Sequence, residues 1–188
     1  LKDVYDYVLS IECIPIFTSD YVAIAQGFLT GKVLKLKDGG WLFKGYQECS
    51  TVRLDNEKRY PDLTRSKGII GFRRWENYLY ISLGFSNEST LYLKNTEPKI
   101  TPYLSQSSTK FTEYSLSKEQ GRFITQSFGK GIYQFHNMLK NKTYALQVTD
   151  IKTGKAVLRQ DVSSNDEGML KIQFLVKGKI EVSFSKKE

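Results

Sequence analysis

The chain has 188 residues, of which 40% are hydrophobic and 26% charged, and its formal net charge is +8. This length suits one domain, or one domain with a short piece of a neighbour, and this composition excludes a disordered chain. No apolar run approaches the ~20 residues of a membrane helix, so we expect no membrane span. The positive charge favours anionic partners such as acidic polysaccharide, although the scattered lysines equally fit a role in solubility.

The first 30 residues are expected to form a helical lead-in. Residue 1 is Leu rather than Met, and apolar residues recur at helical spacing at Leu1, Val4, Tyr5, Val8 and Leu9. We therefore expect a fragment that begins inside a helix, with IPIF (14–17) as a short buried strand. A second helix is expected over about 19–30, with Ser19 and Asp20 as caps and Gly31 at its end.

From residue 31 the pattern changes to the alternation of β-strands. KVLKLK (32–37) and the turn residues 38–40 are followed by the strand candidates WLFKGYQ, STVRLD, YLYISLGF, STLYLK, RFITQSF and GIYQFHNML. The last segments are TYALQVTD, the turn IKTGK, AVLRQDV, the loop SSNDEG, MLKIQFLV, the turn KGK and IEVSFS. Turn signals every ~8–12 residues predict an antiparallel β-sandwich. We expect one such domain over 31–188, because SQSST (105–109) is the sole candidate linker.

The residue inventory argues against a reaction centre. His136 is the single histidine, and Cys13 and Cys49 are far apart in sequence. A zinc site draws on several such ligands at short spacing, so we expect neither a metal nor a cofactor, and we expect His136 to be structural. The cysteines could form one disulfide in an oxidising compartment, or Cys13 could be a buried free thiol.

Three catalytic motifs are also missing or incomplete. GFLTGKV (27–33) is one residue short of a phosphate-binding loop, and Val33 replaces the hydroxyl that would bind magnesium. No G-x-S-x-G motif is present. The carboxylates of Asp62, Glu76 and Glu88 could pair for glycoside hydrolysis, but their spacing carries no signature. We therefore assign no catalytic residue.

A candidate binding surface lies in YLYISLGF (78–85). Alternation predicts Leu79, Ile81, Leu83 and Phe85 on the core face, with Tyr78 and Tyr80 on the other face. In the next strand Leu91 and Leu93 are expected to point inward, which would place Tyr92 outward beside the tyrosine pair. Such a row suits stacked sugar rings and also stacked bases, unless another part of the protein covers it. No RNP-like or helix-turn-helix pattern is present, so nucleic acid is not expected.

The segment RYPDLTRSKG (59–68) is a second candidate. Pro61 fixes φ and Asp62 can close a turn. Arg59, Asp62 and Arg65 could contact a carbohydrate, or an Arg–Asp pair could pin the loop against the sheet.

The segments SDYVAIAQGF, STVRLD, RYPDLTRSKGIIGF, LYISLGF, TPYLSQ and TYALQVTDIKTGKAVLRQDVSSNDEGMLKIQF occur in this order. Together they resemble the C-terminal part of PelA-like proteins, which are bacterial extracytoplasmic proteins that trim and deacetylate an exopolysaccharide. The resemblance covers the whole chain, with residues 1–30 as the end of a truncated barrel-like α/β deacetylase domain and 31–188 as the β-sandwich that follows it. It implies a periplasmic location.

The family's activity is a metal-dependent deacetylation at an Asp/His/His site, and those motifs do not occur in this chain. The resemblance therefore implies a non-catalytic accessory module that braces the upstream catalytic domain and contacts glycan. A partly deacetylated amino-sugar polymer is cationic, so a chain of charge +8 would repel it. The module could face acetylated substrate, or dock with its basic surface on an acidic export-machinery protein. An enzyme with an unrecognised carboxylate site is a third hypothesis.

Overall fold

The computed structural model describes residues 18–187. The helix predicted near the start of the chain, the strand at 14–17 and Cys13 lie outside the described residues. The described chain opens with helix α2 (Thr18–Thr30) and continues as β-strands, so the predicted mainly β fold with a helical lead-in is confirmed. In this described part, no helix has the length and apolarity that crossing a membrane requires.

Helix α2 lies against the strands through a small residue. The buried Gly27 faces the backbone of Tyr46, where a Cβ would come within 2.2 Å of the Tyr46 carbonyl oxygen. The amide of Gly31 donates to the Gly27 carbonyl at 2.9 Å and ends the helix, as expected. Phe28 is 75% exposed, so the helix contacts the sheet through Gly27 and its half-buried neighbours rather than through its largest side chain.

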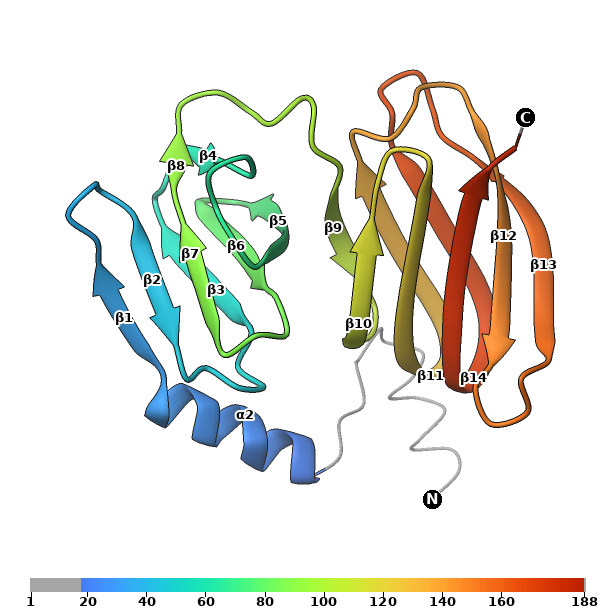
Figure 1. Ribbon diagram of the computed structural model, residues 1–188, viewed down its shortest axis with the longest axis horizontal. Helices are drawn as coiled ribbons and strands as arrows, with labels where there is room; N and C mark the ends of the chain where they lie inside the picture. The colour runs from blue at the N-terminus through green and yellow to red at the C-terminus, as the bar shows by residue number, and fades with distance from the viewer. Residues whose placement is uncertain (1–17, 188) are drawn as a thin grey trace.

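The strands follow one another with short connections (Figure 1). They are β1 (Lys32–Lys35), β2 (Trp41–Lys44), β3 (Thr51–Asp55), β4 (Tyr60–Pro61), β5 (Ile69–Trp75), β6 (Tyr78–Leu83), β7 (Glu88–Leu91), β8 (Leu93–Lys94), β9 (Tyr103–Ser107), β10 (Phe111–Leu116), β11 (Gln120–His136), β12 (Thr143–Asp150), β13 (Ala156–Ser163) and β14 (Leu170–Lys186). We call β1–β8 the N-terminal lobe and β9–β14 the C-terminal lobe. Figure 1 shows the two lobes side by side, with β9 on the side of the C-terminal lobe that faces the N-terminal lobe.

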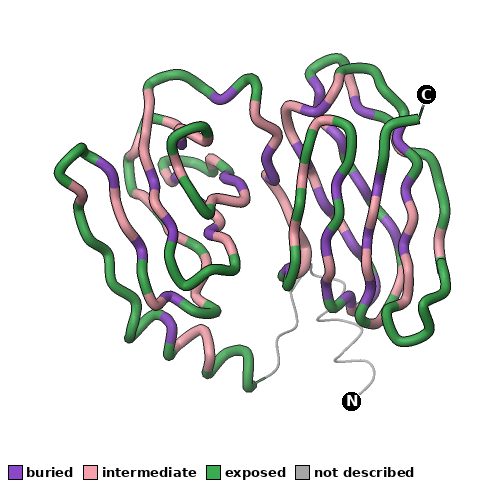
Figure 2. The backbone as a smooth tube through the Cα atoms, viewed as in Figure 1, coloured by how far each residue is buried: buried purple, intermediate pink, exposed green. Residues whose placement is uncertain are grey.

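The N-terminal lobe packs a sheet of order β1-β2-β7 against the neighbouring strands β5-β6-β3. Leu79, Ile81 and Leu83 are buried on one side of β6, as the alternation predicted, and Leu91 of β7 belongs to the same hydrophobic cluster. The expectation for Phe85 is wrong, because it lies beyond the end of β6 and is 49% exposed. Buried and more exposed positions alternate along β6, whereas all of β1 is exposed (Figure 2).

The C-terminal lobe is built on two long strands, β11 and β14, which pair antiparallel throughout. The predicted break between RFITQSF and GIYQFHNML and the predicted turn KGK (177–179) are wrong. Gly129 (φ 147) and Gly178 (φ 116) lie inside these strands rather than at turns. Glycine adopts such angles without a side-chain clash, so a paired strand can curve there. Buried residues alternate on both sides of the curve, so the strands wrap around a cluster that includes Phe123, Tyr133 and Ile180.

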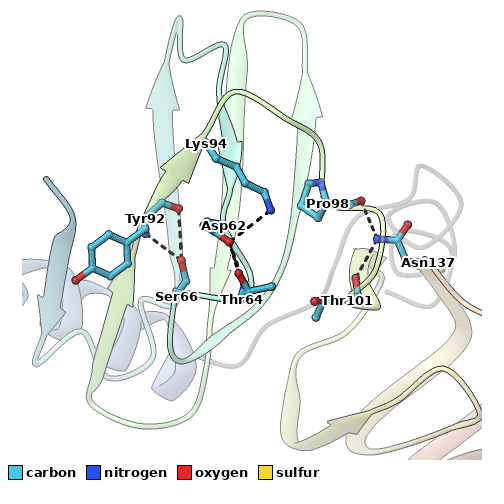
Figure 3. Close-up of polar contacts among 8 residues, drawn as sticks. All are labelled: Asp62, Thr64, Ser66, Tyr92, Lys94, Pro98, Thr101 and Asn137. Atoms are coloured by element: carbon cyan, nitrogen blue, oxygen red, sulfur yellow. Dashed lines mark hydrogen bonds and ion pairs between the residues drawn. The ribbon is translucent and has the colours of Figure 1, made fainter. Parts of the chain in front are cut away.

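Each lobe has its own hydrophobic cluster, and the two clusters meet at the seam of β5 with β9, where Tyr103 of β9 belongs to the N-terminal cluster and Ile70 of β5 packs against the C-terminal one. Among the described strands, β5 and β9 form the one parallel pair, and its register consists of Gly71 opposite Leu104. A second link is the connection between β8 and β9. Asn137 donates from its side-chain amide to the carbonyl oxygens of Pro98 at 2.8 Å and Thr101 at 2.9 Å (Figure 3). This bond pair ties the connection to the C-terminal lobe.

Candidate functional site

The outer side of β3, β6 and β5 brings together aromatic and arginine side chains. In the register of these strands Arg53 and Arg73 flank Tyr80, and Trp75 lies opposite Tyr78. The intervening residues of β6 are buried in the core, so these five side chains share the opposite face. We call Arg53, Arg73, Trp75, Tyr78 and Tyr80 the aromatic face.

The rings and guanidinium groups of the aromatic face hold one another in place. The rings of Tyr78 and Tyr80 meet edge-on, with centroids 6.2 Å apart. The Arg53 guanidinium lies 4.8 Å from the centroid of Tyr78, and that of Arg73 lies 4.9 Å from the centroid of Trp75. Such cation–π contacts are worth ~0.5–1 kcal/mol at exposed sites. Because Trp75 remains 54% exposed, its ring is available for stacking.

The charge of this face is positive on balance. Arg53 forms an ion pair with Asp55, whose Oδ1 lies 3.0 Å from the Arg53 Nε. No ion pair within residues 18–187 engages Arg73. The face thus offers one guanidinium that is paired to a carboxylate and one that is not.

The aromatic face opens into a cleft of about 740 Å³ between the lobes. Arg73 and Tyr80 line it from the N-terminal lobe, and Ser105 and Gln106 of β9 line it from the other side. Glu48 and Lys110 lie on opposite walls of this cleft, and their ion pair links the two walls. Burial lowers the pKa of Lys110, while the charge of Asp20 acts in the opposite direction. The cleft offers hydroxyl, amide and charged groups beside aromatic rings.

A smaller pocket of about 270 Å³, which we call the seam pocket, lies where β5 and β9 separate. The rings of Phe72, Tyr103 and His136 form a stack along it, with centroid separations of 4.3 and 5.2 Å. Burial, and then the charge of Glu97, raise the pKa of Tyr103 to about 12. Burial lowers the pKa of His136. The Gln134 amide nitrogen lies 3.0 Å from the Nε2 of His136, which agrees with a structural role for this histidine.

The prediction that Tyr92 lies beside Tyr78 and Tyr80 is wrong. The strand before it, β7, pairs with β2 rather than with β6, so Tyr92 belongs to the other layer of the lobe. Its hydroxyl donates to the Oδ2 of Asp38 at 2.9 Å, and the Arg65 guanidinium lies 3.8 Å from its ring centroid. The hydrogen bond from Tyr92 has the largest effect in lowering the pKa of Asp38, and the hydrogen bond and charge of Arg65 lower it further. Tyr92 and Arg65 therefore form a separate cluster that fastens the β1–β2 turn.

Asp62 and Arg59 hold the loop before β5 together. The Oδ1 of Asp62 accepts hydrogen bonds from the amide of Thr64 at 3.2 Å and its hydroxyl at 2.7 Å, and Lys94 lies 3.4 Å away (Figure 3). Asp62 thus closes a turn, as its position after Pro61 indicated. Arg59 forms an ion pair with Glu57 rather than with an aspartate. The expected Arg–Asp ion pair of this loop is formed by Arg65 and Asp38.

The interaction of Arg59 with Glu57 should make the stability of this loop depend on pH. Hydrogen bonds from Arg59 lower the pKa of Glu57 from its ordinary 4.5 to about 2. A carboxylate with a lowered pKa stabilises the folded state above pH 4.5, and this contribution is lost as the pH falls from 4.5 towards 2. We expect Glu57→Gln to lower the melting temperature at pH 6, and we expect its difference from the wild type to shrink as the pH falls and to vanish only below about pH 2. Glu88→Gln, which removes an exposed ion pair with Lys44, is the control. Equal melting temperatures of Glu57→Gln and wild type at pH 6 would argue against this role.

Of the six residues predicted from the sequence, Tyr78 and Tyr80 belong to the aromatic face and Arg59, Asp62, Arg65 and Tyr92 do not. Sequence reasoning missed Arg53 and Trp75. The run FRRW (72–75) held part of the signal, since alternation places Arg73 and Trp75 on one side of β5 and Arg74 on the other. Arg74 proves structural, because its guanidinium donates to the carbonyl oxygens of residues 57–59.

Across the described range, no three His, Cys, Asp or Glu side chains gather where they could hold a metal ion. Cys49 is a half-buried free thiol. No family model, no curated protein and no solved structure matches this chain.

Proposed function

We propose that this β-rich chain is a non-catalytic module that binds glycan through the aromatic face. The observation that carries the proposal is the row of the exposed Trp75 and the half-buried Tyr78 and Tyr80 beside Arg53 and Arg73, which reaches the inter-lobe cleft at Arg73 and Tyr80. The apolar CH face of a pyranose stacks on such rings, and the phenol hydroxyls and guanidinium groups hydrogen-bond the sugar's oxygen atoms.

The polar groups around the rings favour a glycan over a nucleic acid. Sugar hydroxyls both donate and accept hydrogen bonds, so they need acceptors as well as donors in the site. The face and cleft supply both kinds, with Asp55 and Glu48 beside Arg53, Arg73 and Lys110. A phosphate backbone offers acceptors alone, so it would give the carboxylates of Asp55 and Glu48 no donor to bind.

The wider setting of the proposal rests on the resemblance to PelA-like proteins. In that setting the module belongs to an exported exopolysaccharide-modifying protein of deacetylase type in the bacterial periplasm. It would brace the catalytic domain and guide acetylated glycan, whose neutral sugars avoid repulsion by the chain's charge of +8.

Affinity electrophoresis of the purified chain in native gels that contain neutral or acidic polysaccharides tests the proposal. We expect at least one glycan to retard the wild type, and the variants Trp75→Ala and Tyr80→Ala to bind about fivefold more weakly each, since each stacked ring is worth ~1 kcal/mol. Phe28→Ala removes an aromatic ring of α2 that is 75% exposed, and it should bind as the wild type does. Unretarded migration in every glycan would contradict the proposal.

A second candidate function is docking on an acidic partner protein. Strand β1 pairs with β2 and, in the part of the chain that the structure describes, with no other strand. Val33 is 63% exposed there, and Lys32 and Lys35 flank the apolar pair of Val33 and Leu34. An exposed edge strand of this kind can accept a strand from another protein. A chain that binds an acidic export protein through β1 and binds no glycan would favour this function.

A further inference from the structure

The bends of β11 and β14 lie at the same end of the C-terminal lobe as the β12–β13 turn (Figure 1). The bends contain Gly129 and Gly178, and the two strands remain paired through them. The amide of Ile151 in the turn donates to the Lys179 carbonyl at 3.0 Å. A Cβ on Gly178 would lie 3.8 Å from the Oδ2 of Asp150, the last residue of β12. Three segments that are far apart in the sequence are therefore neighbours here.

This end of the lobe gathers lysines that the fold does not use. It carries Lys130 of β11, Lys177 and Lys179 of β14, and Lys152 and Lys155 of the β12–β13 turn, and all of them are exposed. No ion pair within residues 18–187 engages any of these lysines. They are therefore available to an anionic partner.

The carboxylates near these lysines do not cancel their charge. Strand β11 carries no acidic residue, and the carboxylate of Glu181 on β14 lies 2.6 Å from the guanidinium of Arg122. Hydrogen bonds from Thr153, and to a smaller extent the charge of Lys152, lower the pKa of Asp150, so this carboxylate stays ionised and offsets one lysine. The charge of this end of the lobe thus remains positive.

Two exposed apolar side chains stand among the lysines. Leu175 is 82% exposed and lies opposite Lys130 in the register of β14 with β11. A Cβ on Gly129 would lie 3.9 Å from the Cδ1 of Leu175 and 3.7 Å from the Cε of Lys177, so both side chains lie over the bend of β11. Ile151 is exposed in the neighbouring turn. We call Leu175, Ile151 and the five lysines the basic tip.

The combination of charge and exposed apolar groups selects among anionic partners. A soluble acidic polymer would contact the lysines but would leave Leu175 and Ile151 without an apolar partner. Two apolar side chains set among lysines make a poor core for a protein interface, which buries ~800 Å² on each partner. An anionic phospholipid bilayer matches both features, because its phosphates attract lysines and the acyl boundary beneath them accepts apolar side chains.

We propose that the basic tip docks this chain on the surface of an anionic phospholipid membrane. The lysines contact the lipid phosphates, and Leu175 and Ile151 enter the headgroup region without any segment spanning the bilayer. This inference goes beyond the proposed glycan binding and does not depend on it, because the aromatic face belongs to the N-terminal lobe and the basic tip to the C-terminal lobe.

Cosedimentation of the purified chain with lipid vesicles tests the proposal. We expect binding to vesicles of phosphatidylcholine with about one third phosphatidylglycerol, and none to vesicles of phosphatidylcholine alone. The double variant Lys177→Gln/Lys179→Gln should bind about 25-fold more weakly, at about fivefold for each lysine removed. Leu175→Ala should bind about tenfold more weakly, because less apolar surface enters the bilayer.

Matched variants away from the tip provide the controls. Lys140→Gln/Lys142→Gln removes two exposed lysines that precede β12, at the opposite end of that strand from the β12–β13 turn. Ile100→Ala truncates a side chain that is 74% exposed in the connection before β9. Both variants should bind the anionic vesicles as the wild type does.

Three results would overturn the proposal. Equal weakening by the two double lysine variants would show that net charge, rather than the basic tip, attracts the vesicles. Unchanged binding by Leu175→Ala would show that this side chain does not enter the bilayer. Binding of the wild type to soluble polygalacturonate but to neither kind of vesicle would identify an acidic polymer as the partner of the lysines.

Discussion

Replacing Gly71 with alanine is expected to separate the unfolding of the two lobes. A Cβ at this position would come within 1.8 Å of the Leu104 carbonyl oxygen, so β5 and β9 would have to move apart. The register between these strands holds no other pair in the described residues, and the hydrophobic clusters of the two lobes meet at this same seam, through Tyr103 and Ile70. Overpacking of this kind costs ~1–3 kcal/mol. We expect that cost to fall on the seam and to weaken the N-terminal lobe most.

The positions of the tryptophans make this prediction easy to measure. The chain has 2 tryptophans, Trp41 and Trp75, and both lie in the N-terminal lobe. Their fluorescence during urea unfolding therefore reports that lobe, while far-UV circular dichroism reports both lobes. We expect coincident transitions for the wild type and an earlier fluorescence transition for Gly71→Ala. Gly154→Ala, which strains a turn at φ 67 without any contact within 4 Å, should keep the transitions coincident. Coincident transitions in Gly71→Ala would contradict the claim that the contact of Gly71 with Leu104 couples the unfolding of the two lobes.

Replacing Phe123 with alanine is expected to give the largest loss of stability. Phe123 is fully buried in the C-terminal cluster, with its ring centroid 4.3 Å from that of Phe111 and 4.6 Å from that of Tyr133. Deleting a buried phenylalanine ring costs ~3–5 kcal/mol, because the removed contacts are only partly recovered by collapse of the cavity. The long strands β11 and β14 enclose this cluster, so their pairing should weaken with it.

Denaturant unfolding followed by far-UV circular dichroism measures this loss. The free energy of unfolding should fall by ~3–5 kcal/mol in Phe123→Ala, while Phe85→Ala, which truncates a ring that is 49% exposed, should lower it by less than ~1 kcal/mol. A loss for Phe123→Ala no larger than that of Phe85→Ala would show that this ring does not organise the C-terminal lobe.

Local patterns in the sequence predicted much of the fold. Strand β6 alternates as expected because its inner face meets a continuous core, which fixes the orientation of each side chain. The β12–β13 hairpin was also predicted, and its turn is closed by Asp150, whose Oδ1 accepts hydrogen bonds from the amide and hydroxyl of Thr153. The turn chemistry is local, so the sequence carries it in full.

Glycine was the main source of error in the strand predictions. Gly129 and Gly178 resemble turn residues when they are considered alone, yet both lie in paired strands. Whether a glycine ends a strand or lets it curve depends on the partner strand, which is far away in sequence. Apolar residues continue the alternation through Gly178, with Val176 and Ile180 on the inner side, whereas the inner positions around Gly129 are Ser127 and Gly131 and carry no apolar pattern.

The candidate site was predicted in part for a related reason. Tyr78 and Tyr80 are two residues apart on one strand, so period-two alternation placed them together. Tyr92 was misplaced, and Arg53 and Trp75 were missed, because their neighbours are set by which strands pair. That β6 lies between β3 and β5, while β7 pairs with β2, is a non-local property that no short pattern encodes.

The central claim is that glycan lies on the outer face of β5 and β6, and the indole signals of the two tryptophans test it most directly. Trp75 is exposed on that face, whereas Trp41 packs against the N-terminal hydrophobic cluster. In two-dimensional ¹H–¹⁵N spectra recorded during titration with a glycan that retards the chain in gels, we expect the Trp75 indole signal to shift to saturation and the Trp41 signal to stay in place. A stationary Trp75 signal at saturating glycan would contradict the claim.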